Sequence, residues 1–310
     1  MSCCNTQSCD SVDRKRFLFL SVKLSGAILS GLLLSSAFPP AESSECAWLA
    51  LVPLIVIARY TRPLRAFLFG LLSGLTFWLW SLSWLLAMMN CGCGFPMVAL
   101  AWISLSVYCS LYTGAFALVV SRIFISGESI SYAKVPNEDK YAGYSMMMTS
   151  IGRFINVLYV FAIPALWVGF EYLRSTLFGG FPWNAVGISQ YRNIAIIQMA
   201  EWGGVYAVSA VVVMMNAVMA VLISRFIDVY ARGIRTGRLH FELIMGLAIG
   251  LFCLTNGVKI VRRVERTDSS GLSARIAMVQ PNIRQALKWG ESQVMEVYRR
   301  LMEHTEIAVA

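Results

Sequence analysis

The chain has 310 residues, of which 57% are hydrophobic and only 14% are charged. Soluble domains carry about 25% charged residues, so this composition excludes an ordinary soluble protein and indicates an integral membrane protein. The formal net charge is +9. Because the basic residues stand in short clusters between apolar segments, and no basic patch alternates with aromatic residues, we expect no nucleic-acid partner.

Residues 1–16 form a polar leader that ends in Arg14, Lys15 and Arg16. The apolar run that follows is long enough to span a bilayer and lacks a clear small-x-small cleavage site, so it is not typical of a cleaved signal peptide. Residues 17–258 predict a mainly α fold, a polytopic membrane helix bundle of about seven spans. The apolar segments are residues 17–38, 46–58, 66–89, 96–125, 155–173, 194–223 and 243–258. The second segment is short for a crossing of about 20 residues.

Positive charge alternates between the connections of these segments. The basic stretches are the leader and residues 59–65, 122–153 and 225–238, whereas residues 39–45 and 90–95 contain no Lys or Arg and residues 174–193 contain two Arg. The positive-inside rule then predicts a cytoplasmic N-terminus, and seven crossings place residues after 258 outside. The run Lys259, Arg262, Arg263 and Arg266 breaks this rule locally. The rule weakens ahead of long translocated domains, so we keep the assignment.

Two charged residues stand at the outer end of the fifth apolar segment. Glu171 and Arg174 are three positions apart, so on a helix they share a face and can pair. One interpretation is an ion pair at the helix end. The other is an anchor for a lipid phosphate, which suits the fork of an Arg guanidinium. Polar residues at membrane depth are functional candidates, and the sequence leaves both interpretations open.

The next connection, residues 179–190 (GGFPWNAVGISQ), is rich in Gly, aromatic and amide residues. Gly179 and Gly180 predict the end of the fifth helix, and Pro182 prevents its simple continuation. Trp183 then stands at the depth of the membrane interface, where aromatic residues commonly form a belt. The density of turn-forming and amide residues favours a structured re-entrant element over a plain belt.

The sixth apolar segment contains two further polar residues. Glu201 is either a carboxylate at headgroup level or part of an outward-facing polar pocket. Asn216 lies deeper, and we expect it to form a hydrogen bond between helices.

The residues after 258 change character. Residues 274–280 (ARIAMVQ) predict an apolar strand, and PNIRQALKW at 281–289 leads into an amphipathic helix. A strand, a turn and a helix cannot bury a core by themselves. We interpret residues 259–310 as the start of an external soluble domain whose remainder lies outside this chain.

Seven motifs distributed along the chain carry a family resemblance. In chain order they are AFPP (37–40), AWLALVPL (47–54), SLYTGAF (110–116), PALWVGFEYLR (164–174), GFPWNAVGISQ (180–190), AEWGGVYAVS (200–209) and VQPNIRQALKW (279–289). Together they resemble the bacterial apolipoprotein N-acyltransferases. The resemblance implies an inner-membrane bundle that carries a periplasmic nitrilase-like α/β domain. It also implies a phospholipid acyl donor and a diacylated lipoprotein acceptor, with no cofactor.

The family's chemistry uses a Glu-Lys-Cys triad, in which a Cys thioester passes the acyl chain to the α-amino group of a lipoprotein's N-terminal cysteine. In the family the Glu lies well beyond the LKW tryptophan, and the four later glutamates of this chain do not match its context. The resemblance therefore places the triad beyond Ala310. We expect a truncated enzyme that lacks catalytic residues and is inactive unless a separate chain completes the domain. The candidate lipid-binding residues are Trp289, Trp183, Arg174, Glu171 and Glu201.

Two other functions are weighed against this one. A non-catalytic lipid-binding or transporter-like bundle should show broken helices in both halves, and only residues 179–183 predict such a break. An acyltransferase that works from the bundle alone would need a His or Cys base within a span. Cys109 lies in a span but has no titratable partner nearby in the sequence.

Overall fold

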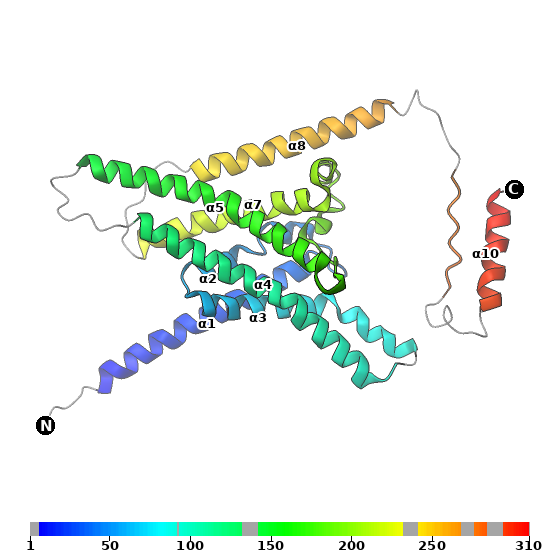
Figure 1. Ribbon diagram of the computed structural model, residues 1–310, viewed down its shortest axis with the longest axis horizontal. Helices are drawn as coiled ribbons and strands as arrows, with labels where there is room; N and C mark the ends of the chain where they lie inside the picture. The colour runs from blue at the N-terminus through cyan, green and yellow to red at the C-terminus, as the bar shows by residue number, and fades with distance from the viewer. Residues whose placement is uncertain are drawn as a thin grey trace. The chain divides into compact units, whose positions relative to one another are not determined.

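The computed structural model describes residues 6–91, 93–131, 142–231, 241–267, 276–283 and 294–309. Six helices in these ranges are long and apolar enough to cross a membrane, judged by length and composition. They are α1 (Thr6–Ser36), α3 (Pro63–Ser81), α4 (Phe95–Ser131), α5 (Ala142–Thr176), α7 (Ala200–Tyr230) and α8 (Phe241–Thr267). The predicted polytopic helix bundle is confirmed (Figure 1).

The second expected span is not a long helix. Residues 46–58 fall in a 3₁₀-helix, Ser44–Trp48, and in the short helix α2, Val52–Arg59. Eight helical residues rise only about 12 Å, so α2 by itself is too short to cross a bilayer. The segment is apolar, as predicted, but it is interrupted between the two helical pieces, so the expectation of a span over residues 46–58 is not met by one helix.

This segment nevertheless carries the chain back along α1. Ser30 Oγ donates a hydrogen bond to the carbonyl oxygen of Ala50 (2.6 Å), and Lys23 Nζ donates to that of Tyr60 (2.8 Å). Moving from residue 50 to residue 60, the chain runs from Ser30 back toward Lys23, so this segment is antiparallel to α1. The chain thus traverses the bundle twice before α3 begins.

The next three helices alternate in the same way. Ser121 Oγ, late in α4, donates to the carbonyl oxygen of Thr61, just before α3 (2.6 Å). Tyr108, in the first half of α4, donates its hydroxyl to the carbonyl oxygen of Leu177, just after α5 (3.1 Å). Helix α4 is therefore antiparallel to both α3 and α5.

Helices α7 and α8 add the last two traverses. Asp228, near the end of α7, forms an ion pair with Arg59 at 2.9 Å, and Glu242, at the start of α8, pairs with Arg225 of α7. Helices α3, α4, α5, α7 and α8 therefore run alternately between the two ends of the bundle. We name its two ends after a residue at each: the Arg59 end holds Arg59, Asp228 and Glu242, and the Arg174 end holds Arg174 and the connection from α5 to α7.

Polar and small side chains hold neighbouring segments together. Asn216 of α7 accepts a hydrogen bond from the N–H of Leu51 and donates one to the carbonyl oxygen of Ala47, both at 2.9 Å. The predicted hydrogen bond between helices is confirmed. On α3, a Cβ placed at Gly74 would lie 2.9 Å from Cα of Ser110, so the glycine allows α3 and α4 to approach closely.

Further described segments are a 3₁₀-helix, Ser83–Cys91, the short helix α6, Ile194–Ile197, residues 276–283 and helix α10, Val294–Val309. Residues 276–280 form neither helix nor strand, so the expected strand at 274–280 is not seen over its described part. A strand needs a neighbour to pair with its N–H and C=O groups, and the described ranges contain no second strand.

Part of the predicted soluble domain, namely residues 268–275, residues 284–293 and Ala310, lies outside the described ranges. The interpretation of residues 259–310 as the start of a nitrilase-like domain therefore stays a prediction. The same holds for the expectation that the catalytic triad lies beyond Ala310, because no described residue bears on it.

Candidate functional site

The connection from α5 to α7 begins with three consecutive residues whose backbone has a positive φ. After Thr176 the chain forms a 3₁₀-turn, Leu177–Gly179, in which φ is +54° at Phe178, followed by +88° at Gly179 and +74° at Gly180. A Cβ at Gly180 would lie 2.1 Å from the carbonyl oxygen of Ser175. Only glycine fits there, because both the left-handed conformation and the contact exclude a side chain. The predicted break of the fifth helix is confirmed.

The chain then turns back into the bundle. A 3₁₀-helix, Val186–Gln190, is almost entirely buried. The N–H of Val186 donates to Glu171 Oε1 at 2.8 Å, and Glu171 lies five residues before the end of α5. At 1.5 Å per residue this bond is about 8 Å below the helix end. The predicted structured re-entrant element is present, and we call residues 177–190 the re-entrant loop.

Glu171 and Arg174 hold this loop from the same helix. Both side chains belong to residues that are only 5% exposed. Arg174 Nη1 donates to the carbonyl oxygens of Phe181 and of Trp183, the latter at 2.8 Å. Among the ion pairs of the described residues, none joins Glu171 to Arg174. Of the two interpretations left open by the sequence, the ion pair is not what the structure shows: both side chains bind the loop backbone, whose buried polar groups must find partners.

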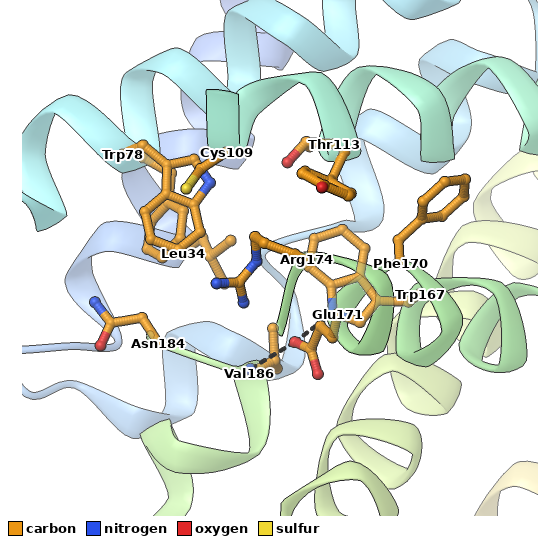
Figure 2. Close-up of a pocket in the computed structure, with 12 residues that line it drawn as sticks. Leu34, Trp78, Cys109, Thr113, Trp167, Phe170, Glu171, Arg174, Asn184 and Val186 are labelled. Atoms are coloured by element: carbon orange, nitrogen blue, oxygen red, sulfur yellow. Dashed lines mark hydrogen bonds between the residues drawn. The ribbon is translucent and has the colours of Figure 1, made fainter. Parts of the chain in front are cut away.

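Two tryptophans complete the surroundings of these charges. Trp167, one turn earlier on α5, donates its indole N–H to Glu171 Oε1 at 2.8 Å. The guanidinium carbon of Arg174 lies 4.8 Å from the ring centroid of Trp78 on α3. This is a cation–π contact, which is strong where the cation is shielded from water. Figure 2 shows the guanidinium directed between Trp78 and the loop, with Glu171 facing Val186.

Side-chain hydrogen bonds fasten the rest of the loop. Asn184 donates to the hydroxyl of Ser81 on α3, and the N–H of Gly187 donates to Ser209 Oγ on α7 at 2.8 Å. Gln190 Oε1 accepts from the indole N–H of Trp48 at 3.1 Å. The loop is thereby tied to three other segments of the chain. Its amide residues gave a signal in the sequence. Trp48 and Ser209 stand in two of the family motifs, but nothing in the sequence paired them or Trp78 and Ser81 with the loop, because all four lie far away along the chain.

A small cavity of about 30 Å³ lies between the loop and α1, α3, α4 and α5. A water molecule needs roughly 10–15 Å³ by this measure, so the cavity has room for about two waters but not for an acyl chain. Cys109 lines it together with Glu171 and Arg174. The fold thus gives Cys109 charged neighbours that were not apparent from the sequence. The space beside its thiol is too small for a lipid thioester.

The outer side of the loop exposes aromatic rings. Trp183 is 46% exposed and stacks on Phe181 with ring centroids 6.1 Å apart, and Phe178 is 92% exposed. Glu201 is exposed in the first turn of α7 and does not line the cavity. Of the five predicted lipid-binding residues, the structure brings together Glu171, Arg174 and the backbone of Trp183. Trp289 lies outside the described residues.

A bundle of long apolar helices with a buried re-entrant loop defines this chain as a polytopic membrane protein. Residues 30–218, more than half of the chain, match the sequence model of one family, the apolipoprotein N-acyltransferase N-terminal domain. The chain therefore belongs to the apolipoprotein N-acyltransferase family. The re-entrant loop, the whole of α3 and most of α7 lie within the matched residues, whereas only the last turns of α1 do.

Three curated relatives illustrate the likeness, and each is named apolipoprotein N-acyltransferase. The protein of Geobacter metallireducens is 30% identical over 94% of this chain and 49% of its own length. That of Pasteurella multocida is 27% identical over 89% and 46%, and that of Chromobacterium violaceum is 27% identical over 96% and 50%. The chain spans about half the length of the curated relatives it matches.

Proposed function

We propose that this chain supplies the membrane part of an apolipoprotein N-acyltransferase of the bacterial inner membrane. The reaction moves a fatty acyl chain from a phospholipid to the α-amino group of the N-terminal cysteine of a diacylated lipoprotein. The observation that carries this proposal is the family match over residues 30–218, which includes the buried re-entrant loop. The triad of the family would come from the half of the relatives' length that this chain does not span, in the region that would follow Ala310.

In this proposal the Arg174 end faces the periplasm and receives the lipid. The exposed rings of Trp183 and Phe178 suit the boundary between acyl chains and headgroups, because aromatic rings prefer that depth. Glu201 would stand at headgroup level, and Trp289 would approach the lipid from the soluble side. Arg174 and Glu171 would act on the lipid by fixing the loop that presents Trp183, since their hydrogen bonds go to the loop.

The test restores the missing half. Residues 1–310 are joined to the second half of the Geobacter metallireducens relative and expressed in cells depleted of their own enzyme. N-terminal acylation of a lipoprotein is measured by mass spectrometry. We expect the joined chain to restore acylation and R174A to lower it, whereas R300Q, an exposed change on α10, should leave it intact.

A second arm expresses the same two halves as separate polypeptides, which asks whether a partner chain can complete the enzyme. Acylation by the separate halves would extend the proposal to a two-chain enzyme. The proposal fails if the intact relative restores acylation while the joined chain is present in the membrane and never does.

A further inference from the structure

The last turns of α8 carry a dense group of cations. Lys259, Arg262, Arg263 and Arg266 lie on one continuous helix and all four are exposed. With about 100° of rotation per residue, their positions fall within about 100° of the helix circumference. We call this group the α8 basic stripe. The far side of the same turns carries Ile260, Val261 and Val264, of which Val264 is 58% exposed, with Glu265 at its edge.

The length of α8 sets the depth of this stripe. The helix begins at the Arg59 end, where Glu242 is buried against Arg225. At 1.5 Å per residue, Lys259 lies about 27 Å and Arg266 about 38 Å along the axis from Phe241. The hydrocarbon core of a bilayer is about 30 Å thick. The stripe therefore begins about one hydrocarbon thickness along α8 from the end at which Glu242 is buried, at the depth of the opposite headgroup layer.

Neither topology nor the helix dipole accounts for so much positive charge here. Basic residues favour the cytoplasmic side, whereas the positive-inside assignment of the earlier connections places residues after 258 outside. The negative end of a helix favours cations only within its last turn. Lys259 and Arg262 stand before that turn, because α8 ends at Thr267.

We infer that the α8 basic stripe binds the headgroups of anionic phospholipids in the leaflet on the far side of the membrane from Glu242. Lys and Arg at this depth lay their methylene stems along acyl chains and reach the phosphates with their charged tips. The apolar far side and the unbroken continuation from the span favour a lipid surface over a soluble anion or an acidic protein. The inference concerns lipid attachment and does not depend on acyl transfer.

The test measures lipid selectivity of the full chain in bilayers. The chain is reconstituted in phosphatidylcholine with a trace of spin-labelled phosphatidylglycerol or spin-labelled phosphatidylcholine, and electron spin resonance gives the fraction of each held at the protein surface. We expect selectivity for phosphatidylglycerol of about fivefold at low salt, falling steeply at high salt. Replacement of the four cations by Gln should remove most of it.

Matched variants keep the result interpretable. K259Q/R262Q/R263Q/R266Q is compared with R299Q/R300Q, which removes exposed cations from α10 and should retain the selectivity. R262K/R263K/R266K keeps the charge and should also retain it, which separates loss of charge from loss of folding. Full selectivity in the four-Gln variant overturns the inference. Abolition of the wild-type selectivity by millimolar inorganic phosphate also overturns it, because the site would then bind a soluble anion.

Discussion

The two ends of the bundle both bury charged residues, but they satisfy them differently. At the Arg59 end, opposite charges meet: Arg59 pairs with Asp228 at 2.9 Å, and Arg225 pairs with Glu242. At the Arg174 end, a carboxylate and a guanidinium on the same helix face make no ion pair with each other and bind loop backbone groups instead.

The difference shows what each end does. The ion pairs join α2 to α7 and α7 to α8, so they fasten regular helices to one another. The charges at the other end compensate for irregular backbone, which is tolerated at membrane depth only where protein groups satisfy its N–H and C=O. Buried ion pairs at the Arg59 end join helices to one another, whereas hydrogen bonds from Glu171 and Arg174 at the other end hold the re-entrant loop.

The largest loss of stability is expected from breaking the ion pair between Arg59 and Asp228. D228A leaves the buried Arg59 without its carboxylate, and loss of one partner of a buried ion pair costs about 3–5 kcal/mol. The hydroxyl of Tyr60 also loses its bond to Asp228. Thermal unfolding in detergent should show a strong fall in midpoint. The double variant R59M/D228L should recover much of the loss, and no recovery would mean that charge pairing is not what the site supplies.

The next effect concerns the backbone of the loop. G180A forces a Cβ to within 2.1 Å of the Ser175 carbonyl oxygen at a φ of +74°, and we expect it to cost at least about 1–3 kcal/mol. G179A is the matched control, since its φ is also positive but no atom lies within 4 Å of the added Cβ. Unfolding midpoints should fall more for G180A, and equal midpoints would contradict the close contact.

A smaller and more local effect is expected for Arg174. R174K keeps a cation beside Trp78 but loses the guanidinium nitrogen Nη1, which donates to two carbonyl oxygens, and a hydrogen bond to a charged group contributes about 1.5–3 kcal/mol. Protease cleavage within residues 179–185 should rise while the unfolding midpoint falls only slightly. Arg192 lies beyond the loop, so R192K is the control. Cleavage of R174K no faster than that of R192K would argue that the hydrogen bonds of Arg174 do not hold the loop.

The smallest effect belongs to the exposed helix α10. Hydrogen bonds from Arg300 and Arg299 lower the pKa of Glu296 below its usual value. A carboxyl whose pKa is lowered on folding stabilises the helix above its usual pKa, and this contribution is lost as pH falls through the lowered value. Circular dichroism of a peptide of residues 294–309 should therefore show helicity falling in acid, below about pH 4. E296Q should weaken this dependence, and helicity that rises in acid would refute it.

Local signals in the sequence predicted the parts of the fold that depend on local physics. Long apolar runs predicted the six long helices, and Gly179 and Gly180 predicted the break after α5. The partners of Glu171 and Arg174 were missed, because the helical spacing favours mutual pairing and the loop competes only once the chain is folded. Trp78 was missed for the same reason. Arg59 and Arg225 were counted toward orientation as basic residues of the connections, yet both are buried in ion pairs.

The central claim is that the re-entrant loop is held inside the bundle by Glu171 and Arg174. Amide hydrogen exchange of the chain in lipid nanodiscs, read by mass spectrometry over residues 185–190, tests it most directly. Because the N–H groups of Val186 and Gly187 bond to Glu171 and Ser209, we predict slow exchange there and a clear acceleration in E171A. Exchange over 185–190 as fast as that of an unstructured peptide, in a chain whose α5 remains protected, would contradict the account.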